Sequence, residues 1–133
     1  MAREQRRLAA ILAADVVGYS RLMGRDESGT LHRLREHREL RLEPALARHA
    51  GRLVKLTGDG ALVEFASVVD ALGAAIEFQQ AMVEANREQP EDTAIVFRVS
   101  LHVGDLIVDG DDLYAFRAGL VVKKDSYWKI VED

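Results

Sequence analysis

The chain has 133 residues, which fits one domain of ordinary size, and its composition of 48% apolar and 30% charged residues is typical of a globular protein. The formal net charge of −4 gives no reason to expect nucleic acid as a partner. The absence of cysteine excludes disulfides, thiolate catalysis and cysteine metal sites. No segment approaches the length of a membrane span, so we expect a cytoplasmic protein without a membrane partner.

The hydrophobic pattern predicts two helices and four strands. In chain order these are a strand Leu8–Val17, a helix from a cap at Asp26 or Ser28 to about His49, strands Arg52–Thr57 and Ala61–Ala66 joined as a hairpin, a helix Val68–Glu88 and a strand Ala94–Val108. Pro44 is expected to kink or restart the first helix, and Gly51 to stop it.

The order strand, helix, strand, strand, helix, strand is the ferredoxin-like βαββαβ pattern of an α+β fold. In such a sheet the first and second strands run parallel and the third lies between them, because crossovers are right-handed and the hairpin is tight. The two helices then cover one face. The other face is left for a partner, for extra segments or for water.

This topology brings two aspartates together. The first strand ends near Asp15, and the parallel second strand ends at Gly58-Asp59, so both ends lie at the same edge of the sheet. Two carboxylates held close repel each other unless a cation or a shared proton lies between them, and proteins bind Mg²⁺ in this manner. Taken alone, Asp15 fits an ordinary strand end and Asp59 an ordinary Asp-Gly turn, so only their convergence favours a metal site.

Lys55 lies on the same hairpin. With the two-residue period of a strand, Leu53, Lys55, Thr57 and Asp59 are expected to share one face. A solvated lysine is the alternative interpretation, because most lysines are exposed.

Three blocks of sequence resemble the class III nucleotide cyclase catalytic domain, in particular the bacterial adenylate cyclase type. They are "ILAADVVGYSRLM", "GRLVKLTGDGALVEF" and "RVSLHVGDLIVDGDDLY", and the match runs over about residues 6–114. The resemblance implies that the ribose 3′-hydroxyl of ATP attacks the α-phosphate to give cyclic AMP and pyrophosphate, with two Mg²⁺ or Mn²⁺ ions at each site. It also implies a head-to-tail homodimer in which each active site spans the interface.

The resemblance further implies a role for each matched residue. The catalytic and metal-binding groups would be Asp15, the carbonyl of Val16, and Asp59; the backbone cradle for phosphate would be Val17, Gly18, Tyr19 and Ser20; the purine would be read by Lys55 and Asp112. The last pair suits adenine, since lysine donates to its N1 acceptor and aspartate accepts from its amino group, whereas guanine reverses both polarities.

The match ends at Tyr114. The family continues with a helix that carries an asparagine and an arginine for the phosphoryl transition state, but here no asparagine follows Asn86 and Arg117 stands at the wrong spacing. We therefore expect a cyclase-like domain over residues 1–114 that is incomplete at its C-terminus, and a divergent tail over 115–133. The tail has two apolar segments around Lys124-Asp125-Ser126, which either pack as a short β-hairpin or fray.

Whether this chain is an enzyme therefore stays open at the level of sequence. Loss of transition-state donors costs about 10²–10³ in rate for each group, which predicts an impaired adenylate cyclase. The alternative is a catalytically inactive module with a cyclase fold that binds nucleotide or forms a dimer.

Overall fold

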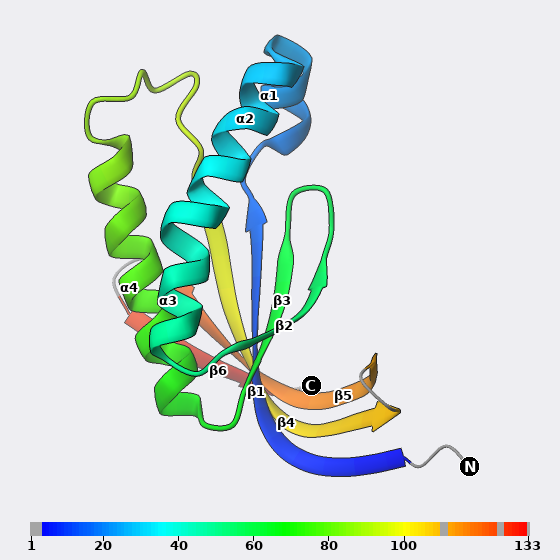
Figure 1. The fold of residues 1–133 in the computed structure, drawn as a ribbon. Helices are drawn as coiled ribbons and strands as arrows, with labels where there is room; N and C mark the ends of the chain where they lie inside the picture. The colour runs from blue at the N-terminus through cyan, green and yellow to red at the C-terminus, as the bar shows by residue number, and fades with distance from the viewer. Residues whose placement is uncertain (1–3, 110–111, 125–126, 133) are drawn as a thin grey trace.

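A single six-stranded sheet organises the molecule (Figure 1). The computed structural model describes the backbone of residues 4–109, 112–124 and 127–132, and the side chains of residues 9–104. The strands are β1 (Glu4–Val16), β2 (Arg52–Leu56), β3 (Ala61–Phe65), β4 (Phe97–Asp109), β5 (Asp112–Lys124) and β6 (Tyr127–Glu132). The helices are α1 (Tyr19–Arg25), α2 (Glu27–His37), a π-helical turn η1 (Arg38–Leu42), α3 (Glu43–Arg48) and α4 (Val68–Asn86).

The predicted α+β, ferredoxin-like core is confirmed. The sheet order is β2-β3-β1-β4-β5-β6, and every neighbouring pair is antiparallel. β3 therefore lies between β1 and β2, which run parallel to each other. Figure 1 shows α2, α3 and α4 gathered on one side of the sheet.

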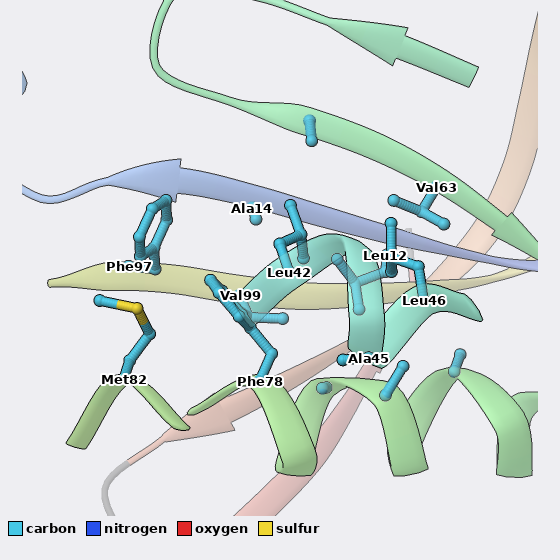
Figure 2. Packing of buried hydrophobic residues seen from close by; sticks show 14 of the residues in the cluster. Leu12, Ala14, Leu42, Ala45, Leu46, Val63, Phe78, Met82, Phe97 and Val99 are labelled. Carbon is cyan, nitrogen blue, oxygen red and sulfur yellow. The ribbon is translucent and has the colours of Figure 1, made fainter. Parts of the chain in front are cut away.

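Alternate residues of β1 separate the two faces of the sheet. Leu12 faces the helices between Val63 of β3 and Leu101 of β4, and all three side chains are fully buried. Figure 2 shows Leu12 and Val63 in the same cluster as Phe78 of α4, and Leu101 belongs to that cluster too. Asp15 has the other parity and therefore lies on the face away from the helices.

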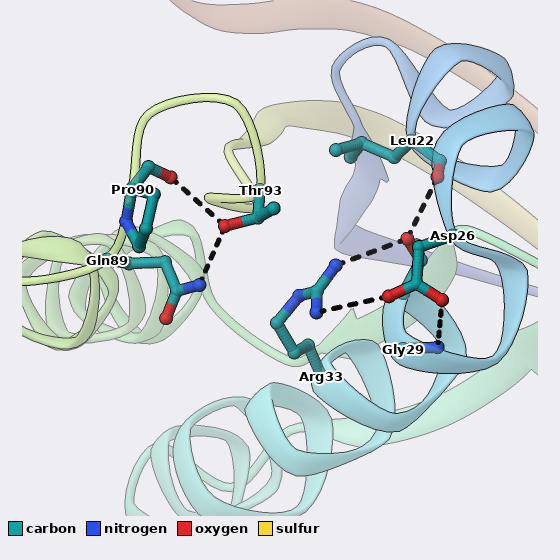
Figure 3. Close-up of polar contacts among 8 residues, drawn as sticks. Leu22, Asp26, Gly29, Arg33, Gln89, Pro90 and Thr93 are labelled. Atoms are coloured by element: carbon teal, nitrogen blue, oxygen red, sulfur yellow. Dashed lines mark hydrogen bonds and ion pairs between the residues drawn. The ribbon is translucent and has the colours of Figure 1, made fainter.

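The helical segment after β1 is broken at Asp26, between α1 and α2, and polar contacts join the two helices there (Figure 3). Asp26 caps α2 by accepting a hydrogen bond from the amide of Gly29 at 3.0 Å, which confirms the first of the two predicted caps. Thr30, buried in the next turn, donates to the carbonyl of Leu22 at 3.0 Å and so ties α2 to α1. Pro44 lies in the first turn of α3, directly after the π-helical turn. The backbone stays in the right-handed helical region through Leu42 and Glu43, so the helix continues through a π-helical turn and does not restart.

The end of α3 differs from the prediction in a specific way. The left-handed residue is Ala50, with φ of 55°, and not Gly51. The amide of Gly51 then donates to the carbonyl of Leu46 at 2.8 Å, the long bond that closes a helix end. Gly51 is required for another reason: a Cβ atom there would stand 2.6 Å from the ring of Phe65.

Two side-chain amides of α4 bind the backbone at the start of β4. Gln79 donates to the carbonyl of Phe97 at 2.9 Å, and Asn86 donates to that of Ile95 at 2.8 Å. The ring of Phe97 packs against Phe78, with centroids 5.0 Å apart, and against the edge of His37 at 6.5 Å. Burial, with a smaller effect of Arg41, lowers the pKa of His37, so this ring packs as a neutral imidazole near neutral pH.

A β-bulge interrupts the expected alternation of side chains in β2. Leu53 pairs with Val63, but Lys55 pairs with the neighbouring Leu62, so Val54 is the extra residue. Leu53 and Lys55 therefore point to opposite faces, and the prediction that they share one was wrong. Lys55 lies on the face away from the helices, because Leu62 pairs with Ala13, next but one to Asp15.

The backbone after Tyr114 extends the sheet. β5 pairs along β4, and β6 pairs along β5, around a connection that lies outside the described residues. β5 starts at Asp112, well before the apolar segment that the sequence indicated. Among the residues that the structure describes, no helix has the length and apolar character needed to cross a membrane.

Candidate active site

Asp15 lies at the exposed end of β1 and is bound by an arginine. Arg98 of β4 faces it directly in the β1–β4 pairing. The Arg98 Nε donates to Oδ1 of Asp15 at 3.0 Å, and Nη2 donates to Oδ2 at 3.1 Å. This is a bidentate pair, which holds the carboxylate in one orientation.

The tip of the β2–β3 hairpin reaches the same end of the sheet. The amide of Thr57 donates to the carbonyl of Gly60 at 2.9 Å, so Gly58 and Asp59 are the two residues of the turn. Ala14 of β1 pairs with Ala61, the residue that follows the turn. Gly60 is packed so closely against β1 that a Cβ atom would lie 2.7 Å from the carbonyl oxygen of Ala14. The turn is therefore held next to the end of β1.

The electrostatics agree with this placement. The hydrogen bonds and charge of Asp15, together with a weaker effect of Asp59, raise the pKa of Arg98 above its ordinary value. One guanidinium thus lies in the field of both carboxylates. The backbone thus has the convergence that the topology predicts, and the guanidinium of Arg98 is bound to one of the two carboxylates.

The segment after β1 turns sharply into α1. Gly18 takes the left-handed conformation, with φ of 66° and ψ of 35°, and precedes the first residue of the helix. The side chain of Arg21 folds back over it, so that a Cβ at position 18 would lie 3.3 Å from Nη2. A Cβ at Gly58 would lie 3.5 Å from the hydroxyl of Tyr19, so this segment also touches the hairpin tip.

The two predicted purine-reading residues are not neighbours in the sheet of one chain. Lys55 is exposed and pairs with Leu62, near the Asp15 end of β1. Asp112 pairs with Asp109, which pairs with Glu4 at the other end of β1. The side chain of Asp112 lies outside the described part of the structure.

Two hollows lie near the hairpin. A small one of about 20 Å³ lies behind its tip, against Ala14, Asp59 and Phe97, and has room for about one water molecule. A groove of about 330 Å³ lies between α3 and β2, and its lining is mainly leucine with Arg38 and Glu43. None of the predicted site residues lines this groove, so it is separate from the site.

The donor set fits a divalent metal of the magnesium type. Asp15 and Asp59 would supply carboxylate oxygens, and Val16, the residue after Asp15, would supply a backbone carbonyl. Among the described residues there is no cluster of three or more acidic or histidine side chains, so the protein offers few ligands of its own. Mg²⁺ tolerates such a set, because it keeps water or substrate phosphate in its remaining positions.

Comparison with known proteins gives the family. No family model matches the chain. "Putative adenylate cyclase 3" of Rhizobium meliloti (strain 1021) is 55% identical over 116 residues, which is 86% of this chain and 20% of that protein. The crystal structure of an adenylate/guanylate cyclase/hydrolase from Silicibacter pomeroyi matches with a TM-score of 0.79 and 41% identity, over 85% of this chain and 66% of that one. The chain belongs to the class III nucleotide cyclase domains.

A more distant cyclase domain shows how far the shared fold extends. The crystal structure of the adenylyl cyclase CyaB from P. aeruginosa is 16% identical, with a TM-score of 0.66 over 97% of this chain and 66% of that chain. At this identity the likeness concerns the fold alone. The cyclase-like chain thus spans about two thirds of the solved chains named here and a fifth of the length of the Rhizobium relative.

Sequence reasoning missed two residues of this cyclase-like site. Arg98 was not singled out, although antiparallel pairing of the first and last predicted strands would have placed it close to Asp15. Arg21 was not selected either, and its position over Gly18 has no sequence signal beyond its closeness in the chain.

Proposed function

We propose that this chain binds a divalent metal and a nucleoside triphosphate at the end of β1, as part of an adenylate cyclase site. The observation that carries the proposal is the position of Asp15 beside the Gly58-Asp59 turn, which pairs with the end of β1 at Ala61 and packs against it at Gly60. The reaction would be conversion of ATP to cyclic AMP and pyrophosphate in cyclic nucleotide signalling. The Rhizobium relative, named as an adenylate cyclase, supports this choice.

The chain's own groups would divide the work as follows. Asp15, Asp59 and the carbonyl of Val16 would hold two Mg²⁺ or Mn²⁺ ions, which when bound neutralise phosphate charge and favour ionisation of the attacking hydroxyl. The backbone amides of residues 18–20 would bind phosphate at the start of α1, where the first helical N–H groups have no partner within the helix. The amide of Val17, which was predicted to join them, already donates to the carbonyl of Val96 at 2.9 Å. The left-handed turn at Gly18 separates the end of β1 from this group of amides.

Base recognition would come from a second copy of the chain. Lys55 lies on the sheet face away from the helices, the same face as Asp15. In the proposed homodimer, Lys55 of one chain would read the adenine of the site formed by Asp15 and Asp59 of the other. The register places Asp112 at the opposite end of β1 from Lys55, roughly 30 Å away along the strand, so Asp112 is not assigned to the same base. Lysine as a donor to N1 favours adenine, because guanine presents a donor at that position and leaves buried polar groups unsatisfied at about 1–3 kcal/mol each.

A second candidate is a nucleotide-binding or dimerisation module without turnover. It is favoured by the segment after Tyr114, which contains no asparagine and whose described backbone forms β5 and β6. A cyclase-like chain without the asparagine and arginine would turn over very slowly, since each missing transition-state donor costs about 10²–10³ in rate.

The test separates binding from chemistry. Mn²⁺ affinity is measured by titration calorimetry without nucleotide, and cyclic AMP formation from Mn²⁺-ATP is measured on the same purified protein. We expect Asp59→Ala to weaken Mn²⁺ binding. We also expect it to lower the rate of cyclic AMP formation by about a hundredfold or more. Asp92→Ala is the matched control, because Asp92 is an exposed carboxylate that pairs with Arg25 away from the site.

Each outcome assigns a function. Binding together with turnover supports the cyclase, and binding without turnover supports the module. Unchanged Mn²⁺ affinity in Asp59→Ala would refute the metal role of the hairpin.

A further inference from the structure

Arg98 holds the carboxylate on which metal binding depends. Its fork occupies both oxygens of Asp15, with Nε–Oδ1 and Nη2–Oδ2 distances of 3.0 and 3.1 Å. The two residues face each other in the register of β1 and β4, so the contact is built into the sheet. A divalent cation that binds Asp15 competes with the guanidinium for the lone pairs of these oxygens, and the two positive charges repel each other across the same carboxylate.

The contact is also easy to break. The side chain of Asp15 is 43% exposed and that of Arg98 is 68% exposed, so water reaches both partners. Exposed ion pairs of this kind are weak, so a divalent ion that binds both carboxylates can displace the guanidinium. Arg98 can therefore leave without disturbing the core.

We propose that Arg98 is an internal competitor of the metal: it occupies Asp15 in the metal-free chain and is displaced when a divalent cation binds. This inference rests on the proposed metal role of Asp15. In the metal-free state the arginine offsets the repulsion between the carboxylates of Asp15 and Asp59 and keeps Asp15 in the orientation that the metal meets. The same contact lowers the affinity for metal, so half-occupancy of the site needs a proportionally higher concentration of free cation.

Mn²⁺ titration of the full chain without nucleotide tests the competition. Arg98→Gln removes the charge and the fork and is expected to tighten Mn²⁺ binding about two- to fivefold, as release from an exposed ion pair predicts. Arg98→Lys keeps the charge but loses the bidentate geometry, and its affinity should fall between the two. Arg25→Gln is the matched control, because Arg25 forms an exposed pair of the same kind with Asp92 and its loss should leave Mn²⁺ affinity unchanged.

A second readout follows the arginine itself. In the metal-free protein the Nε–H resonance of Arg98 should show protection by Asp15, and it should lose that protection when Mg²⁺ is added. The resonance of Arg25 should not change. Asp15→Asn should remove both the protection of Arg98 and the response to Mg²⁺.

The outcomes distinguish this inference from the function on which it rests. If Asp15→Asn weakens Mn²⁺ binding while Arg98→Gln binds no more tightly than the unaltered chain, the competition is refuted and the metal site stands. If Arg98→Gln binds Mn²⁺ more weakly, Arg98 supports the bound metal and the proposal is also overturned. If Asp15→Asn leaves Mn²⁺ affinity unchanged, the metal role of Asp15 fails and the competition fails with it.

Discussion

At the scale of single residues, the site is defined by what lies next to each aspartate. The nearness of Asp15 and the Asp59 turn was predicted from the sequence, because strand topology brings their positions together. Arg98 was not found, because nothing in its local sequence distinguishes it from any exposed arginine of a strand. Its role depends on a cross-strand register between residues that are far apart in the chain, and register is set by the whole sheet.

Gly60 offers a test of how the hairpin tip is placed. A Cβ there would meet the carbonyl oxygen of Ala14 at 2.7 Å, and this backbone atom cannot turn aside. We expect Gly60→Ala to push the turn away from β1, to lower the free energy of unfolding by about 1–3 kcal/mol and to weaken Mn²⁺ binding. Urea denaturation and Mn²⁺ titration measure the two effects.

Gly24 provides the matched control. It lies in α1, and no atom lies within 4 Å of the position that a Cβ would take. Gly24→Ala should leave Mn²⁺ affinity unchanged and raise stability by up to about 1 kcal/mol through helix propensity. Equal Mn²⁺ affinities in the two variants would contradict a hairpin tip held by Gly60.

At the scale of elements, the strands and helices followed from hydrophobic periodicity, while their irregularities did not. The predicted hairpin is present, yet the bulge at Val54 turns Lys55 to the face opposite Leu53. A period-two pattern contains no information about one extra residue. β4 starts at Phe97 and not at Ala94, because the amide of Ala94 donates to the carbonyl of Pro90 and closes a turn.

The end of α3 leads us to expect that glycine changes the free energy of unfolding in opposite directions at two alanines. Ala50 has φ of 55°, where a side chain costs about 1–2 kcal/mol and glycine costs less. Ala50→Gly is therefore expected to raise the free energy of unfolding by about 1 kcal/mol. Ala47→Gly, in the regular part of the same helix, should lower it by about as much. Thermal and urea denaturation compare the variants, and a loss of stability in Ala50→Gly would contradict the left-handed helix end.

At the scale of the whole molecule, one sheet separates the core from the site. Helices pack on one face, and Asp15, Arg98 and Lys55 lie on the other. Substitutions of these three residues should therefore affect binding more than folding. A protein with its site on the sheet face away from the helices is also suited to share that site with a second copy.

A mixing experiment tests whether the proposed site is shared. Asp59→Ala and Lys55→Ala should each lose Mn²⁺-ATP binding when alone. In an equal mixture half of the dimers contain both variants, and each of these has one intact site, so about a quarter of all sites should bind again. Equilibrium dialysis with Mn²⁺-ATP measures the recovery. Absence of recovery in a mixture shown to exchange subunits would mean that each chain forms its own site.

Gly51 has a consequence for how such a chain can change over generations. Its missing Cβ is filled by the ring of Phe65 and a methyl group of Val63, which are side chains and can themselves be replaced. An alanine at position 51 therefore becomes acceptable once the side chain at position 65 is shorter, and the two positions should drift as a correlated pair. At Gly60 the obstacle is main chain, for which no second substitution compensates, so that position should stay invariant while the pair at 51 and 65 varies.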